Sequence, residues 1–131
     1  MLAYNDNPEI KSAVIAVVQA HYDADEIIKG TYWDKGKGCA VGCILDGWGK
    51  HKGAARVNHG NHAEFDLILG PGGHALARLC DTIFEGLNNG HAKEWPLRFM
   101  SAIKPGSDVS RAQRQFLHWL LTDEAVNPGI N

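Results

Sequence analysis

The spacing of apolar residues, and of the residues that start and stop helices, constrains this fold more than any other feature of the sequence. Apolar residues recur three and four positions apart in successive segments, separated by glycine, proline and asparagine. No segment shows the convincing apolar–polar alternation of a strand. Helices are expected over about 8–29, 39–46, 62–69, 74–87, 91–103 and 109–124. We therefore predict an all-α fold: a compact single domain, residues 1–131, of about six helices in an orthogonal or bundle-like arrangement.

The first predicted helix has the clearest boundaries. Asn7 is expected to cap it, Pro8 to occupy its first turn, and Gly30 to end it. Its apolar residues share one face, and His21 and Asp25 fall on that same face. An unpaired polar group is unfavourable on a buried face, so both are candidate site residues. The alternative is that a backbone group or a neighbouring helix end satisfies them.

Two further expectations concern the middle and the end of the chain. Residues 47–60 are rich in glycine, lysine and histidine and predict a mobile loop. The last helix is expected to turn one apolar face into the core, formed by Val109, Ala112, Phe116, Trp119 and Leu120.

Composition excludes some classes of function. Thirteen basic and fifteen acidic side chains give a net charge of -2, which argues against a general binder of nucleic acid or anionic membranes. No apolar run is long enough to cross a bilayer. Without a recognisable targeting signal, the three cysteines predict reduced thiols and a cytoplasmic location.

Residues 36–43, Gly-Lys-Gly-Cys-Ala-Val-Gly-Cys, form the most specific motif. On a helix, Cys39 and Cys43 would lie on one face with Cβ atoms about 5–6 Å apart, too far for a disulfide. Lys37 and Gly38 would form a turn before the helix, where an anion could bind. The glycines could equally serve only to turn the chain and let helices approach.

A reactive thiol is one reading of the motif. Cys39 at a helix start, near Lys37, has surroundings that favour the thiolate. His21 would then act as the base and Asp25 would orient its ring, giving a Cys-His-Asp arrangement.

A metal site is the other chemical reading. Cys39 and Cys43 could chelate one ion, with Asp46 one turn later and His59 and His62 beyond. This spacing is close to that of a zinc finger, although the histidine pair is tighter than usual.

Arg78, Asp81 and Glu85 form a charged row on one face of the fourth predicted helix. A solvated row of ion pairs is the default reading of such a pattern. If another segment covers the row, these residues become candidates for a binding site.

Four short motifs of the sequence together resemble those of a family of hypothetical proteins from bacteria, phages and environmental sequences, which has no established activity. The motifs are Lys37–Cys43, Ala77–Leu79, Ile83–Leu87 and Trp95-Pro96. The resemblance covers about residues 21–123. It implies one shared fold and one shared site, and matches the family at His21, Asp25, Gly30, Tyr32, Cys39, Cys43, His62, Arg78, Asp81 and Glu85. The chain departs from the family at Asp46, where a histidine is usual, and at Cys80, where an acid is usual.

The sequence favours a module that binds a small ligand or a protein partner in a pocket around the helix of Cys39 and Cys43. The expected ligand-binding residues are Lys37, Gly38, Cys43, His62, Arg78, Asp81 and Glu85. A thiol enzyme using Cys39, His21 and Asp25 is the first alternative, and a Cys/His zinc module the second. The sequence names no cofactor; it is compatible with a homo-oligomer, and it predicts neither nucleic-acid nor membrane binding.

Overall fold

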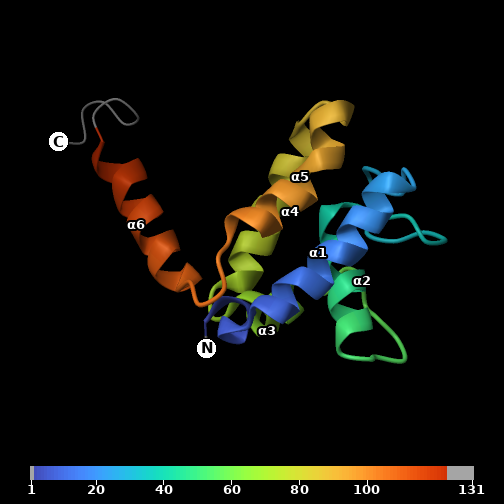
Figure 1. The fold of residues 1–131 in the computed structure, drawn as a ribbon. Coiled ribbons are helices and arrows are strands. Elements are labelled where there is room, and N and C mark those ends of the chain that lie inside the picture. The colour runs from blue at the N-terminus through green and yellow to red at the C-terminus, as the bar shows by residue number, and fades with distance from the viewer. Residues whose placement is uncertain (1, 124–131) are drawn as a thin grey trace.

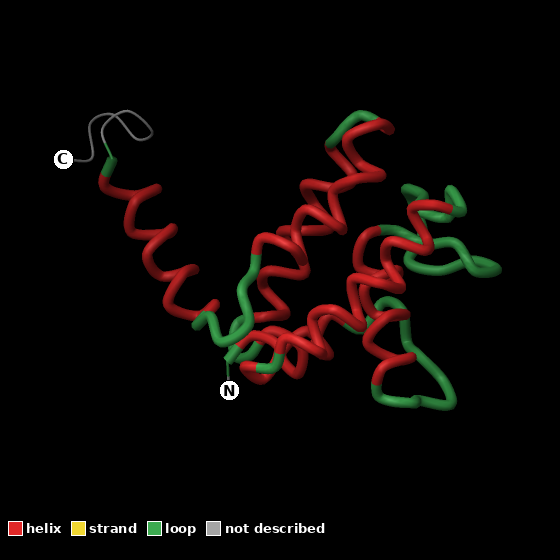
Figure 2. Tube along the Cα trace, in the orientation of Figure 1, coloured by secondary structure: helices red, strands yellow, loops and turns green. Residues whose placement is uncertain are grey.

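The prediction of an all-α fold is confirmed. The computed structural model describes residues 2–123, apart from the side chain of Leu120, and contains no strand within them. Figure 2 shows helices joined by loops and turns. The elements are η1 (Ala3–Asp6), α1 (Pro8–Asp23), α2 (Ala40–His51), η2 (His62–Glu64), α3 (Phe65–Leu69), α4 (Gly73–Gly86), α5 (Asn89–Ala102) and α6 (Val109–Thr122). None of these helices is long and apolar enough to cross a membrane.

Helix α1 begins as predicted and ends earlier than predicted. The Asn7 side chain accepts a hydrogen bond from the Glu9 amide, with Pro8 at the first helical position. The helix ends at Asp23, not near Lys29, and Asp25 has a left-handed φ of 56°. The chain reverses here because Ile27 pairs with Gly38 in an isolated bridge, which a straight helix would prevent.

Helix α2 continues to His51, so the predicted loop from Gly47 is wrong over its first five residues. Both glycines in this stretch mark close contacts. A Cβ at Gly47 would lie 2.9 Å from the Val14 carbonyl oxygen, and one at Gly49 would lie 2.2 Å from Val57 Cγ2. These residues bring α1 and the 52–61 loop against α2, which outweighs the weak helix propensity of glycine.

Asparagine side chains cap two further helical segments. Asn61 caps the 62–69 segment through the Ala63 amide, and Asn88 caps α5 through the His91 amide. Helix α5 continues through Pro96, although a proline inside a helix usually breaks or kinks it.

Five helices enclose the core. Helix α1 packs on α2 and α5, and α4 packs on α3 and α5, as Figure 1 shows. The Tyr4 hydroxyl donates to the Met100 carbonyl at 2.7 Å and ties the first residues to α5. The largest buried side chains of this core include Phe65, Phe84, Ile44, Leu45 and Ile68.

Helix α6 does not pack as predicted. It begins after the Asp108 cap and points away from the body (Figure 1); among the described side chains of its expected inner face, Val109 alone is buried. Phe116 is 54% exposed and Trp119 is 48% exposed. Ala112 is also exposed, and the Leu120 side chain lies outside what the structure describes.

Candidate functional site

The glycines of the 36–43 motif allow a loop to lie directly on the first turn of α2. A Cβ at Gly38 would lie 2.2 Å from the Tyr32 carbonyl oxygen, and one at Gly42 would lie 1.7 Å from the same atom. No side chain fits at such a distance. The loop of residues 24–38 therefore packs against α2 through its backbone.

Hydrogen bonds fix the two ends of this 24–38 loop. The Gly38 amide donates to the Glu26 carbonyl at 3.0 Å, and the Ile28 amide donates to the Gly38 carbonyl at 2.8 Å. The Cys39 amide donates to the Thr31 carbonyl at 3.0 Å. Because these amides already donate hydrogen bonds to carbonyl oxygens of the loop and its ends, the Gly-Lys-Gly turn does not form the anion-binding site that the sequence suggested.

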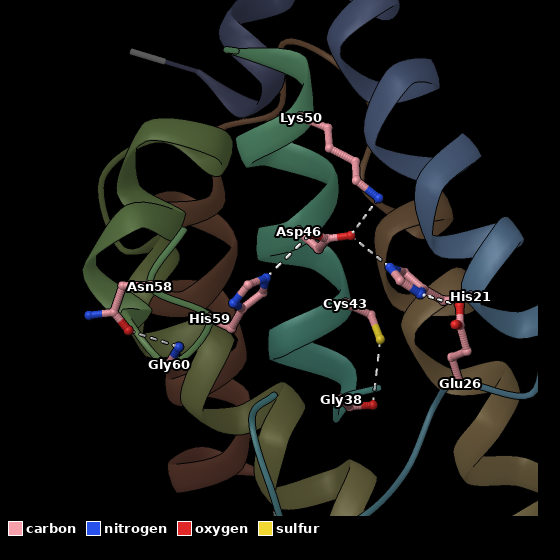
Figure 3. A network of polar contacts seen from close by, with 9 residues as sticks. All are labelled: His21, Glu26, Gly38, Cys43, Asp46, Lys50, Asn58, His59 and Gly60. Carbon is pink, nitrogen blue, oxygen red and sulfur yellow. Dashed lines mark hydrogen bonds and ion pairs between the residues drawn. The ribbon is translucent and has the colours of Figure 1, made fainter. Parts of the chain in front are cut away.

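His21 lies between two carboxylates at the base of the loop (Figure 3). Its Nδ1 is 2.8 Å from Glu26 Oε1, and its Nε2 is 2.8 Å from Asp46 Oδ2. Ionised carboxylates only accept hydrogen bonds, so this arrangement is satisfied when both ring nitrogens carry a proton. Neither nitrogen is then free to deprotonate a thiol.

Asp46 connects this contact to two more basic groups. Lys50 Nζ is 3.0 Å from Oδ2, and His59 Nε2 is 3.3 Å from Oδ1. Burial raises the pKa of Asp46, but the hydrogen bonds from His21, Lys50 and His59 outweigh it and hold the pKa below its usual 3.8. We call Glu26, His21, Asp46, Lys50 and His59 the Asp46 network.

Trp33 connects the 24–38 loop, in which it lies, to the 52–61 loop that contains His59. Its ring stacks on His59 with centroids 3.9 Å apart and meets the edge of His21 at 5.4 Å. The indole thus lies against both imidazoles, and it holds the 24–38 loop to the segment that carries His59.

A small pocket opens beside the loop, between residues 30–32 and α4. Its volume is about 190 Å³, and its lining residues are Gly30, Thr31, Tyr32, Cys39, Asp81 and Glu85. The Gly30 amide donates to Glu85 Oε1 at 3.1 Å. The Tyr32 ring meets His62 edge-on at 5.4 Å, which brings His62 to the rim.

The pocket carries an excess of negative charge. Burial raises the pKa of Asp81, and Glu85 raises it further; His62 and a hydrogen bond with Cys39 oppose this in part. Within residues 2–123, neither Asp81 nor Glu85 forms an ion pair with a basic side chain. Arg78, one turn before Asp81, points to solvent. Asp81 is half-buried and Glu85 is exposed, so the predicted charged row is covered only at Asp81.

The thiols lack the properties of a nucleophile. Cys39 is 1% exposed, and burial raises its pKa to about 11, although the amides of Gly42 and Val41 lower it. Burial raises the pKa of Cys43 to about 12, and its thiol donates to the Gly38 carbonyl at 3.5 Å. Both are free cysteines, as their spacing predicted. The expected activation at the helix N-terminus is outweighed by burial.

The predicted contact of Asp25 with His21 is wrong, because it assumed that α1 extends beyond Asp25. Asp25 lies beyond the helix, is exposed, and pairs with Lys93 of α5. The carboxylates that do contact His21 are Glu26 and Asp46. Glu26 could have been found only by placing the chain reversal correctly; Asp46 had a signal, namely an acid on an otherwise apolar helix.

The hypothesis of a metal site has no geometric support among the described residues. In residues 2–123 no three His, Cys, Asp or Glu side chains are placed to hold an ion. His59 contacts Asp46, and His62 contacts Tyr32 instead. Lys37 is engaged through its backbone, which exchanges hydrogen bonds with Asp34.

Comparison of the chain with protein-family models, curated proteins and solved structures gave no match. Its function is therefore inferred from the geometry of the site.

Proposed function

We propose that this protein binds a small cationic ligand, an amine or a guanidine, in the acidic pocket between residues 30–32 and α4. The observation that carries the proposal is the pair of carboxylates, Asp81 and Glu85, on one wall of a concave site without a basic partner within the described chain. A bound cation would supply the missing charge.

The rest of the pocket suits such a ligand. The Tyr32 ring borders it and offers an aromatic surface to a cation. Cys39 contributes an uncharged thiol, because burial holds its pKa near 11. A volume of about 190 Å³ is below the range of about 300–1,000 Å³ typical of drug-sized ligands, so the ligand is a small molecule or one charged group of a larger one.

The Asp46 network has a supporting role in this proposal. It fixes the 24–38 loop through His21 and Glu26, and that loop carries three of the residues around the pocket. The network itself has its polar groups satisfied, so we assign it to positioning the wall and not to binding.

Calorimetric titration with n-butylguanidinium tests the proposal, with n-butylurea as a neutral molecule of nearly the same shape. We expect the guanidinium to bind and the urea not to bind. Asp81→Asn should weaken binding at least about tenfold, since a hydrogen bond to a charged group contributes about 1.5–3 kcal/mol. Equal affinity for the two probes would contradict the proposal.

A matched control separates local charge from overall charge. Glu94→Gln on α5 removes the same charge from an exposed position outside the pocket, and should leave the affinity unchanged. Asp81→Asn should also unfold at a temperature no lower than the wild type, because burial raises the pKa of Asp81 and its ionised form opposes folding. Lost binding in a folded variant would then be a property of the pocket.

We also propose a cytoplasmic protein. Its three cysteines are buried and free, which suits a reducing compartment. A role in general nucleic-acid binding is not supported by a net charge of -2.

A further inference from the structure

Helix α6 has an apolar face that the other described residues leave largely exposed. Phe116, Leu117, Trp119 and Leu121 are each about half exposed. Beyond Gln113 the side-chain hydrogen bonds of α6 with other described residues join positions one turn apart, such as Arg114 with Ser110. Figure 1 shows the helix extending from the body along most of its length. A contiguous apolar face of this kind marks an interaction site.

A second apolar surface faces α6 across an open groove. The groove has a volume of about 520 Å³ and is lined by Leu76 of α4, Trp95, Phe99 and Ala102 of α5, and Val109 and Ala112 at the base of α6. Trp95 and Phe99 are only partly buried here. The body and α6 therefore each present an uncovered apolar wall.

Helix α6 is held away from its own groove. The Ala3 amide donates to the Ser107 carbonyl, and the Gly106 amide donates to the Ala3 carbonyl, both at 2.9 Å. Gly106 has a φ of 84°, and a Cβ there would lie 2.5 Å from Asp6 Oδ1. The Gln113 side chain donates to the Gly72 carbonyl. Closing α6 onto α5 of the same chain would break these contacts.

We propose that two copies of this chain form a symmetric dimer in which each α6 lies in the groove of the other copy. The two-fold axis makes the two contacts identical, so the apolar face of α6 and the apolar wall of the groove are covered in both copies, as in an isologous interface. The Phe116 face of one helix meets the Trp95 and Phe99 wall of the partner copy. A second copy is favoured because the two apolar walls belong to the same chain.

Charge supports the same occupant. Arg111 and Arg114 are the only charged residues of α6, so 11 basic and 15 acidic residues remain outside it. The helix carries a charge of +2 and the rest of the chain a charge of -4. Among the residues that line the groove, Arg98 alone is charged, so this attraction acts between α6 and the acidic body as a whole and not within the groove.

Light scattering of the full chain after gel filtration tests the proposal. We expect twice the mass of one chain, with dissociation only on dilution over about a hundredfold range of concentration. Phe116→Glu should give a monomer with unchanged circular dichroism, since Phe116 is exposed in the single chain. Gln115→Glu, the same charge change on the polar face of α6, should remain a dimer.

A substitution in the groove distinguishes the proposed exchange, in which each α6 lies in the groove of the other copy, from a dimer in which the two α6 helices pair only with each other. Ala102 is exposed and borders the groove, so Ala102→Arg should block the groove without disturbing the core and should give a monomer. A dimer that survives Ala102→Arg but not Phe116→Glu would overturn the exchange. A monomeric wild type would overturn it as well, and its binding to phosphatidylserine vesicles would assign α6 to a membrane surface instead.

Discussion

Two glycines of the 36–43 motif control how the 24–38 loop meets α2. Gly38 and Gly42 are four residues apart, and both face the backbone of Tyr32. The cysteines of the same motif, also four residues apart, point into the core and the pocket floor. At this scale the motif is explained by close packing of a loop on a helix, with Cys39 as a neutral part of the pocket wall.

Replacing Gly42 by alanine should destabilise the protein. Alanine normally favours a helix over glycine by about 1 kcal/mol, but a Cβ here would lie 1.7 Å from the Tyr32 carbonyl oxygen. We expect a net loss of about 1–3 kcal/mol in the free energy of unfolding, measured in urea. Gly86→Ala is the control, because a Cβ there meets nothing within 4 Å; it should keep or slightly raise the stability.

The cysteines should be slow to alkylate in the folded protein. Burial raises the pKa of Cys39 to about 11 and that of Cys43 to about 12, so few thiolates form near pH 8. We expect iodoacetamide labelling, followed by mass spectrometry, to be at least about a hundredfold slower than in urea. Rapid labelling of Cys39 alone near pH 7 would contradict this prediction and favour the thiol-enzyme hypothesis over a binding module.

At the scale of elements, the Asp46 network joins α1, α2 and two loops. His21 comes from α1, Asp46 and Lys50 from α2, Glu26 from the 24–38 loop and His59 from the 52–61 loop (Figure 3). Backbone hydrogen bonds and the contacts at Gly38 and Gly42 hold the 24–38 loop on α2. The network adds side-chain contacts that join this loop and the 52–61 loop to the helices, and so supports the wall of the pocket beside Tyr32.

Asp46→Asn should cost about 3 kcal/mol of stability, because it leaves His21 and its neighbours without a buried carboxylate. The hydrogen bonds of Asp46 hold its pKa below 3.8, so its contribution is complete above that value and is lost as the pH falls further. Urea unfolding at pH 7 and below pH 4 should therefore show a difference between wild type and variant that shrinks in acid. Asp66→Asn removes an exposed contact with His74 and should change stability by less than about 1 kcal/mol.

Local signals in the sequence predicted the elements well, and long-range contacts explain the failures. The predicted cap at Asn7 depends on adjacent residues, and it is present. The end of α1 depends on the pairing of Ile27 with Gly38, which apolar spacing through Ile28 does not reveal.

The surroundings of the proposed site depend on both local and long-range contacts. Helical spacing put Asp81 and Glu85 on one face, and the structure places residues 30–32 beside them at the same pocket. The partners of His21 and the position of α6 depend on the whole fold. The amphipathic pattern of α6 was visible, but a pattern identifies an apolar face without identifying what covers it.

At the scale of the whole molecule, the chain has a closed part and an open part. The bundle of α1 to α5 buries the core and positions the acidic pocket, while α6 projects with an uncovered apolar face (Figure 1). The pocket and the α6 groove share no lining residue. Ligand binding and dimer formation can therefore be tested separately in the variants above.

The central claim, that the acidic pocket binds a cation, is tested most directly by amide chemical shifts in a titration of the full chain with n-butylguanidinium. The account predicts saturable shifts at residues 30–32, at Cys39 and along α4 around Asp81 and Glu85, with little change in α6. Shifts that appear elsewhere, or that n-butylurea reproduces, would contradict it.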